Sequence, residues 1–339
     1  MNSIKIAIHH SPNSFSDRWI KYCERNGIAY KIVDCYKSDI IYQLDECDAL
    51  MWHYHHSSPR DFLFAKQLLY SVQASGKKVF PDYHTVWHFD DKVGQKYLLE
   101  AINAPLVPSY IFYSRKSAIE WVNKTSFPKV FKLRGGAGSI NVKLVKNKRI
   151  AIRLIKKAFR RGYKHSSQLD IKERYRLITI GKGSMLSLFK GMARLFISSD
   201  FAKIHGREKG YIYFQDYLPN NDSDTRIIVI GDKAFGIKRL VRKGDFRASG
   251  SGSLLFEKYE IDERCLKIAF DLIKKLNAQC IAYDFIFDEK NLPLIVEISY
   301  GFSVEAYDSC PGYWDRDLNW HEGQFNPQEW MIEDLIRSI

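Results

Sequence analysis

Apolar and polar residues alternate in two different patterns over roughly the first 85 residues. Apolar positions at helical spacing, each series preceded by capping residues, predict helices over 16–27 and 58–76. Short apolar runs typical of buried strands cover 3–10, 29–36, 48–56 and 77–81. Strands and helices that alternate in this way predict an open α/β sheet, which binds ligands beyond the carboxyl ends of its strands.

Histidines gather at the predicted strand ends, at His9, His10, His53, His55 and His56. His53 and His55 fall on one face of an extended segment, which invites a metal interpretation. No Asp, Glu or Cys follows them at a known metal-binding spacing. The sequence leaves open whether these imidazoles bind a metal, contact a substrate or pack in loops.

The second half of the chain is richer in strand patterns. Predicted strands cover 211–219, 224–232 and 233–241. Apolar residues at helical spacing predict a helix over 261–278, and Asn326 followed by Pro327 marks the start of a C-terminal helix. These elements surround the segment that carries the most specific polar residues.

Three oxygen-bearing side chains interrupt an apolar hairpin pattern over 281–302. If the sequence DEKN is a four-residue turn, Phe287 pairs with Leu292, and Glu297 lies diagonally opposite Asp284. Ser299 then falls on the same face, because strand side chains alternate. Oxygen ligands gathered in this way suit Mg²⁺, although two carboxylates on an exposed sheet face give the same pattern.

Composition narrows the class of protein. A chain of 339 residues is long enough for two or three subdomains. It has no apolar run of 18 residues, so no transmembrane helix is expected. The apolar stretch at its N-terminus is too short for a signal peptide. Six scattered cysteines without a CxxC pair favour a reduced, cytoplasmic protein.

Positive charge is concentrated in one segment. Residues 143–209 contain 19 Lys and Arg but 4 Asp and Glu, a net charge of +15. The rest of the chain holds 33 basic and 35 acidic residues, a net charge of −2. A local positive surface indicates an anionic partner such as a phosphate, a membrane or a nucleic acid, unless it is only a solvated helical face.

Two glycine-rich loops are shaped for anions. Gly135, Gly136 and Gly138 allow backbone N–H groups to approach phosphate, and Lys132 precedes them as a candidate phosphate-binding cation. No Gly-Lys-Ser/Thr sequence follows, so this is not a P-loop. Arg247 lies in a second Gly/Ser loop, after Arg226 and Arg239 on successive predicted strands; surface ion pairs are the alternative for these arginines.

The order of these features resembles the ATP-grasp superfamily, and in particular the branch of the ribosomal-protein glutamate ligases, with D-alanine–D-alanine ligase as a relative. The resemblance covers about residues 90–305 and is strongest over 224–247 and 284–299. It implies an α/β fold of the α+β ATP-grasp type, with an N-terminal open α/β domain and two subdomains that sandwich the nucleotide. The boundaries expected from it are 1–89, 90–310 with a basic insertion at 146–209, and a C-terminal tail and helix at 311–339.

The resemblance also implies roles for individual residues. Those expected to contact ATP are Lys92, Lys132, Gly135, Gly136, Ala137, Gly138, Gln215, Asp216, Tyr217 and Leu218. Those expected to contact the transferred phosphate or acyl phosphate are Arg226, Arg239 and Arg247. Those expected to hold Mg²⁺, with two ions anticipated, are Asp284, Glu297 and Ser299. Ser299 departs from the family, which has Asn there, so water or a neighbour such as Ser303 could complete the site.

The activity implied is an ATP-dependent carboxylate–amine ligase that forms an amide through an acyl phosphate. The basic insertion, longer and more basic than in the related ligases, extends this to an acidic sugar, nucleotide- or lipid-linked, in polysaccharide biosynthesis. Peripheral contact of 146–209 with the inner membrane surface is then expected, with no nucleic-acid partner. The alternatives are an ATP-grasp phosphotransferase, and a basic adaptor without catalysis that binds membrane or nucleic acid.

Overall fold

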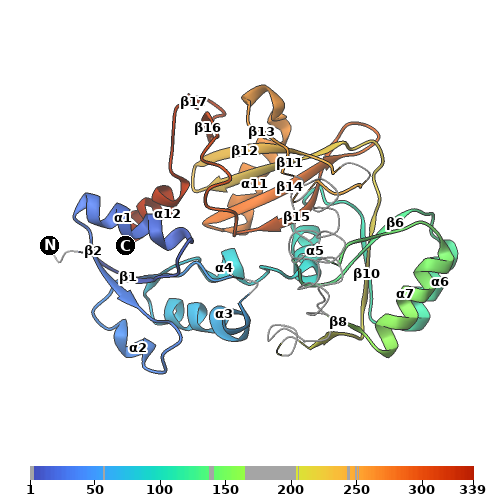
Figure 1. Ribbon diagram of the computed structural model, residues 1–339, viewed down its shortest axis with the longest axis horizontal. Coiled ribbons are helices and arrows are strands. Elements are labelled where there is room, and N and C mark those ends of the chain that lie inside the picture. The colour runs from blue at the N-terminus through green and yellow to red at the C-terminus, as the bar shows by residue number, and fades with distance from the viewer. Residues whose placement is uncertain are drawn as a thin grey trace, which may run out of the picture.

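Three large sheets and one two-stranded sheet organise the chain (Figure 1). The computed structural model describes residues 4–55, 58–136, 141–164, 204, 206–242, 245–248, 250 and 252–339. In Figure 1 the N-terminal sheet lies at the left, a small antiparallel sheet at the right, and the largest sheet above them. None of the helices in these ranges is long and apolar enough to cross a membrane.

The N-terminal sheet has four parallel strands in the order β2–β1–β3–β4. Its strands are β1 (Lys5–His9), β2 (Ala29–Val33), β3 (Ala49–Met51) and β4 (Lys78–Phe80). The helices between and after them are α1 (Phe15–Asn26), α2 (Ile40–Gln43), α3 (Pro59–Ala74) and α4 (Tyr83–Val86). Ser14 caps α1, and Gly27 ends it in the left-handed region at φ 64°. The predicted open α/β sheet is confirmed.

The small antiparallel sheet has the strand order β5–β10–β6–β7. Its strands are β5 (Ser109–Phe112), β6 (Lys129–Lys132), β7 (Lys143–Val145) and β10 (Ile212–Asp216), and β8 (Tyr163–Lys164) pairs separately with β9 (Arg207–Glu208). Two neighbouring helices, α6 (Arg115–Lys124) and α7 (Lys148–Arg160), cover one face. The buried residues of these helices share one hydrophobic cluster with Phe131 and Phe214.

The largest sheet has the order β15–β14–β11–β12–β16–β17, with β13 beside β12. Its strands are β11 (Ser223–Ile230), β12 (Lys233–Leu240), β13 (Leu254–Leu255), β14 (Cys280–Phe287), β15 (Pro293–Ser299), β16 (Gly312–Asp315) and β17 (Trp320–Glu322). Helix α11 (Glu263–Leu276), preceded by the short 3₁₀ helix at Lys258–Glu260, packs its apolar stripe on one face. Helix α5 (Lys92–Ala101) contacts β15 at the edge of the sheet.

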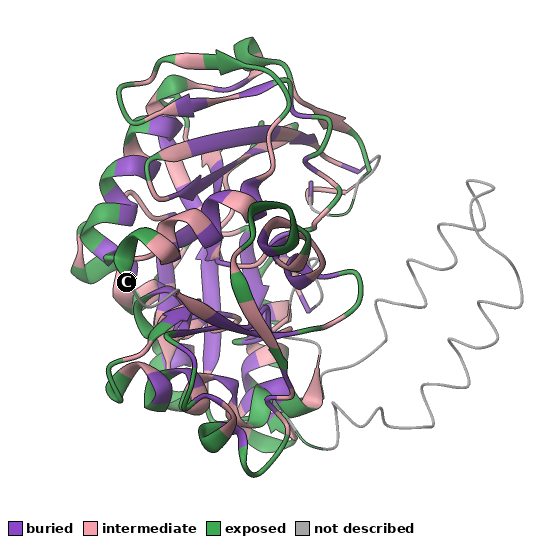
Figure 2. Ribbon diagram, turned by 90° about the vertical axis from the view of Figure 1, so that its left-hand side faces the viewer, coloured by how far each residue is buried: buried purple, intermediate pink, exposed green. Residues whose placement is uncertain are grey.

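The other face of the largest sheet shares a core with the N-terminal sheet. Helix α12 (Pro327–Ser338) packs against α1 between them, and Ile8, Trp19, Phe235 and Met331 belong to one buried cluster. Ion pairs Arg18–Asp308 at 2.6 Å and Arg25–Glu329 at 2.7 Å add contacts at its rim. The strands of the sheets are largely buried while the outer sides of the helices are exposed (Figure 2). The end of the chain thus fixes the N-terminal domain against the largest sheet.

The predicted register of the β14–β15 hairpin is wrong. Phe287 pairs with Pro293, so the turn has five residues, and Asp288 N–H donates to the Leu292 carbonyl at 3.0 Å. A β-bulge follows, because Phe285 pairs with Ile295 while Asp284 pairs with Glu297. The extra residue, Val296, restores both carboxylates to one face, so they lie directly rather than diagonally opposite each other.

Candidate active site

A cavity of about 500 Å³ opens where the N-terminal sheet, the small sheet and the largest sheet meet. Most of the site residues predicted from the sequence line it: Lys92, Lys132, Gly136, Gln215, Asp216, Tyr217, Leu218, Arg226, Arg247, Asp284, Glu297 and Ser299. Residues as far apart in the sequence as Lys92 and Ser299 therefore face one space. Arg239 and Gly135 do not line it, and Ala137 and Gly138 lie outside the described residues.

The paired carboxylates depend on the bulge at Val296. Continued in the register of the turn, β15 would place Val296 opposite Asp284 and turn Glu297 to the core face with α11. With the bulge, Glu297 lies opposite Asp284 on the cavity side, and Ser299 lies two residues further on that face. One extra residue in the strand thus creates the acidic side of the site.

Two arginines hold Asp284 from the neighbouring strands. Arg226, directly opposite on β11, donates to both carboxylate oxygens at 2.6 and 2.8 Å. Arg239 on β12 reaches the same carboxylate at 3.0 Å. Burial by itself would raise the pKa of Asp284, but the two guanidinium groups outweigh it and hold this pKa well below its usual range.

Asp224 completes this row of charges and was not among the residues expected from the sequence. It faces Arg239 across the β11–β12 pair and accepts two hydrogen bonds from it, at 2.6 and 2.7 Å. Burial raises the pKa of Asp224 despite that partner. Arg239 therefore bridges Asp224 and Asp284 behind the cavity wall. The signal in the sequence was the spacing of Asp224 and Arg226, which puts both on one face of β11.

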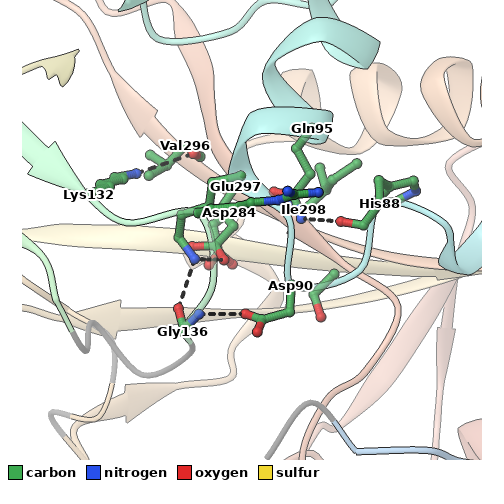
Figure 3. A network of polar contacts seen from close by, with 12 residues as sticks. His88, Asp90, Gln95, Lys132, Gly136, Asp284, Val296, Glu297 and Ile298 are labelled. Atoms are coloured by element: carbon green, nitrogen blue, oxygen red, sulfur yellow. Dashed lines mark hydrogen bonds and ion pairs between the residues drawn. The ribbon is translucent and has the colours of Figure 1, made fainter. Parts of the chain in front are cut away.

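Lys92 and Lys132 approach the carboxylates from the other side. Lys92 Nζ lies 2.9 Å from Glu297 Oε1 and donates to the Gly136 carbonyl at 2.8 Å (Figure 3). Burial opposes its charge, but Glu297 and Asp90 outweigh that effect and raise the pKa of Lys92. Lys132 is also buried, and the side-chain hydrogen bond that it makes to a described residue, the Val296 carbonyl, is long at 3.5 Å. Burial lowers the pKa of Lys132 to about 8.

The start of the glycine loop is tied to the same network. Asp90 Oδ1 accepts from the Gly136 N–H at 2.7 Å, and Gly136 has a φ of 117°, a conformation that favours glycine. Arg134 pairs with Asp91, at the cap of α5. The described part of the loop is therefore anchored beside Lys92. Asp90 is a second residue that the sequence did not single out.

Gln95 connects α5 to the strand that carries Glu297. Its amide nitrogen donates to the His88 carbonyl at 3.1 Å, and its carbonyl oxygen accepts from the Ile298 N–H at 3.3 Å (Figure 3). Gln95 is buried and lies one helical turn after Lys92. The residue next to Glu297 is thereby held to the helix that supplies its lysine partner.

Four residues at and just after the end of β10, where the chain leaves the small sheet for the largest sheet, line the cavity: Gln215, Asp216, Tyr217 and Leu218. Gln215 donates to Ser109 Oγ at 3.1 Å, and that hydroxyl also accepts from Tyr213 at 2.9 Å. Asp216 pairs with Lys129 at 2.6 Å. These contacts fix the side chains on β10 at the edge of the cavity.

Arg247 and Ser299 line the cavity while engaged locally. The Arg247 guanidinium binds the Asp245 carboxylate, with Nε 3.0 Å from Oδ1. The Ser299 hydroxyl donates to the Gly301 carbonyl at 2.9 Å and accepts from the Gly301 N–H at 3.2 Å. Ser299 thus shapes the turn after β15, and its oxygen keeps one lone pair for another contact.

The N-terminal sheet supplies the opposite end of the cavity. Asn13, His53 and His55 line it, as expected for residues at strand ends, whereas His9 and His10 do not. His53 stacks on Phe15 with ring centroids 3.6 Å apart, and its Nδ1 accepts from the Phe15 N–H at 3.2 Å. The described residues contain no group of three His, Cys, Asp or Glu that could hold a metal ion. His56 lies outside the described residues.

The donors present fit Mg²⁺ and a nucleotide. Mg²⁺ is commonly held by one or two carboxylates together with substrate phosphates, and Asp284 and Glu297 provide such a pair. Among the described residues, Lys132 is a buried cation without a short side-chain hydrogen bond, and a phosphate oxygen would supply one.

Comparison with known proteins confirms the resemblance to the ATP-grasp superfamily. Residues 193–310 match the model of the RimK-like ATP-grasp domain. No curated protein sequence matches the chain. The match and the structural likeness confirm the predicted ATP-grasp fold and leave the activity and the substrates open.

Solved structures confirm the ATP-grasp fold along the whole chain. A RimK domain ATP-grasp protein from Sphaerobacter thermophilus has 12% identity and a TM-score of 0.55, with 98% of this chain and 99% of that chain covered. D-alanine–D-alanine ligase from Bacillus anthracis complexed with ATP has 12% identity and a TM-score of 0.59, with 100% and 98% covered. The biotin carboxylase domain of 2-oxoglutarate carboxylase from Hydrogenobacter thermophilus has 13% identity and a TM-score of 0.60, with 98% of this chain and 69% of that chain covered.

Proposed function

We propose that this chain, an ATP-grasp protein by fold, is an ATP-dependent carboxylate–amine ligase. The observation that carries the proposal is the meeting of charges in one cavity. Two carboxylates, Asp284 and Glu297, are paired across a sheet, with arginines on one side and two buried lysines on the other. Phosphoryl transfer depends mainly on positioning and charge stabilisation, and this arrangement supplies both.

The nucleotide is proposed to lie between the segment 215–218 and the two buried lysines. The backbone of Tyr217 and Leu218 would contact the adenine edge, and Asp216 the ribose. Lys92 and Lys132 would contact the phosphates, with the loop at Gly136 closing over them. ATP and Mg²⁺ are named in the titles of neighbouring structures, which supports this assignment without giving its geometry.

The reaction then has two displacements. A carboxylate oxygen of the substrate attacks the γ-phosphorus, the bond to ADP breaks, and an acyl phosphate forms. The nitrogen of an amine attacks the carbonyl carbon, phosphate leaves, and the amine loses a proton as the amide forms. Arg226 and Arg247, which line the cavity, would stabilise negative charge on the transferred group, while Arg239 would act through Asp284. A closed cavity would exclude water that hydrolyses the acyl phosphate.

Mg²⁺, for which two ions are proposed, would neutralise charge on the phosphate oxygens when bound. Asp284 and Glu297 would hold it, with Ser299 contributing directly or through water. Arg226 and Arg239 lower the pKa of Asp284 and keep it ionised, and Lys92 orients Glu297 through an ion pair at 2.9 Å.

Trapping of the acyl phosphate tests this proposal. The protein is incubated with ATP, Mg²⁺ and a panel of carboxylic acids, with hydroxylamine as the amine, and hydroxamates are detected by mass spectrometry. A ligase gives a hydroxamate together with free phosphate. A phosphotransferase would instead leave the phosphate on a hydroxyl of the acceptor, and that product would contradict the proposal.

An acidic sugar is the substrate class proposed for the carboxylate. The support is the net charge of +15 over residues 143–209 of the sequence, because a uronic acid carries both a carboxylate and a negative charge that a basic segment attracts. A nucleotide- or lipid-linked donor in polysaccharide biosynthesis would fit a cytoplasmic enzyme at the inner membrane surface. Turnover of small amino acids with no uronic-acid donor accepted would contradict this part of the proposal.

A further inference from the structure

Helices α6 and α7 form a basic outer surface on the small sheet. Each buries one side against the sheet, through residues such as Ala118 and Ile155, and turns the other to solvent. In Figure 1 the two helices lie side by side at the right-hand end of the molecule, the end opposite the N-terminal sheet. Their outer sides make one continuous face.

The exposed charges on this face have one sign. Its exposed basic residues are Arg115, Lys116, Lys124, Lys148, Arg149, Arg153, Lys156, Lys157, Arg160 and Arg161. Glu120 is the one acidic residue in α6, and α7 has none. Within the described residues, none of these ten basic side chains forms an ion pair with a carboxylate. We call this set the α6–α7 surface.

The charge pattern opposes the stability of α7 itself. Arg149, Arg153 and Lys157 follow each other at four-residue spacing, where like charges destabilise a helix. Lys148 and Arg149 also occupy the first turn, where the helix dipole disfavours cations. Asn147 Oδ1 accepts a hydrogen bond from the Ile150 N–H at 3.1 Å and caps the helix. The basic residues of α7, in contrast, have no acidic residue in the helix to balance their charge. An external anionic partner explains such a pattern.

The shape of the α6–α7 surface selects the kind of partner. None of its ten residues lines the active-site cavity, so it does not serve to hold the reacting groups. Trp121 and Phe159 pack toward the core, which leaves no stacking platform for bases on the described parts of these helices. Charges spread over the outer sides of two neighbouring helices match a planar anionic surface.

We infer that the α6–α7 surface docks on a membrane that contains anionic lipids. Each Lys or Arg near such a surface adds to binding, and the sum of several gives a reversible attachment that salt weakens. The inference does not depend on the proposed ligase reaction. It places the small subdomain against the bilayer and leaves the cavity's other walls facing the cytoplasmic side.

Vesicle co-sedimentation tests the inference with the full-length protein. We expect binding to vesicles of phosphatidylglycerol and phosphatidylcholine, no binding to phosphatidylcholine alone, and release at high salt. The triple variant R149E/R153E/K157E should lower the partition coefficient at least about tenfold, because three attractive charges become repulsive. The matched control K267E/K274E/K275E makes the same charge change on exposed positions of α11 and should lower it far less.

Circular dichroism of each variant checks that the helices and the fold are retained. A double variant, R153Q/K157Q, which keeps helix-forming residues, provides a second comparison and should weaken binding in proportion to the two charges removed. Equal loss of binding in the α7 and α11 variants would overturn the inference. So would absence of binding to the anionic vesicles, or binding to a soluble acidic polysaccharide or RNA that α7 variants weaken while vesicle binding stays unchanged.

Discussion

At the scale of single residues, Lys132 is the most telling group in the cavity. It is buried, its side-chain hydrogen bond to the Val296 carbonyl is 3.5 Å long, and burial lowers its pKa to about 8. A lysine in that condition is destabilised as a cation in the free protein, and an anionic ligand would reverse the effect. Its neighbour Lys92 has two short contacts and a raised pKa.

Nucleotide affinity should therefore fall as the pH rises through about 8, the pKa of Lys132 in the free protein. We expect the Kd for ADP, measured by calorimetry, to weaken by about tenfold between pH 8 and 9.5, because the proton must be taken up on binding. Lys132→Arg, which stays charged, should bind ADP with little change over this range. The same loss in Lys132→Arg would contradict the assignment.

The lowered pKa of Lys132 also makes the stability of the fold depend on pH. The folded-state pKa of Lys132 lies below its value in the unfolded chain, about 10.4. Below pH 8 the lysine is charged in both states, so its burial costs stability in full. Between these two pKa values the unfolded chain holds more protons, so this group's contribution makes the folded state more stable as the pH rises.

Removal of the Asp284 charge should strongly destabilise the fold. Asp284→Asn leaves Arg226 and Arg239 buried without their shared carboxylate, and breaking such a group costs about 3–5 kcal/mol. The folded-state pKa of Asp284 is lowered, so its stabilisation is full above its unfolded pKa of about 3.9 and is lost as the pH falls below that value. Urea unfolding at pH 7 and pH 3.5 measures both effects.

Asp271→Asn on exposed α11 is the matched control and should change the free energy of unfolding by less than about 0.5 kcal/mol. If Asp284→Asn proves as stable as this control at pH 7, the buried arginines are not held as described.

At the scale of elements, the bulge in β15 decides which way Glu297 faces. The alternating pattern predicted the hairpin and the convergence of Asp284, Glu297 and Ser299 on one face. It could not predict the bulge, because an extra residue is selected by hydrogen bonds to other elements. The Val296 carbonyl contacts Lys132 and Gln215 from the small sheet, at 3.5 and 3.4 Å.

Spacing along the chain made the helices, the strands and the location of the site predictable. The roles of Asp224 and Gln95 depend on contacts between elements instead. Apolar periodicity reports which face of an element is buried, and strand ends report where ligands bind. The partner of Arg239 depends on the register between β11 and β12, and the role of Gln95 depends on how α5 meets β15. Neither relation leaves a periodic signal in the sequence.

Gln95 should act on activity through the position of Glu297. Gln95→Leu removes both hydrogen bonds and takes the acceptor of the Ile298 N–H away, at a cost of about 1–3 kcal/mol, while the His88 carbonyl keeps its hydrogen bond from the Asp91 N–H. In ATPase assays over a range of Mg²⁺ concentrations, we expect a higher Mg²⁺ concentration for half-maximal rate. An unchanged Mg²⁺ requirement would show that Gln95 is only a packing residue.

Gln328→Leu in α12 provides the control for that variant. Gln328 is fully buried and accepts a hydrogen bond from Arg18 at 3.1 Å, away from the cavity. Its replacement should lower stability in a similar way while the Mg²⁺ requirement stays that of the wild type.

At the scale of the whole molecule, three sheets converge so that no one of them holds the site alone. The small sheet and α5 bring lysines, the largest sheet brings carboxylates and arginines, and the N-terminal sheet closes the far end with His53 and His55. The common core of α1 and α12 fixes the N-terminal sheet against the largest sheet. Within the described residues, Lys132 and Gln215 of the small sheet both reach the Val296 carbonyl of the largest sheet.

The most direct test of the account is release of phosphate from ATP by wild type and Glu297→Gln, across pairs of carboxylic acids and amines. For wild type we predict phosphate release that requires both substrates and equals the amide formed, as counted by mass spectrometry. Glu297→Gln, which loses the ion pair with Lys92, should fall at least about a hundredfold. Equal rates in the two proteins, or phosphate retained on an acceptor hydroxyl, would contradict the assignment of a carboxylate–amine ligase.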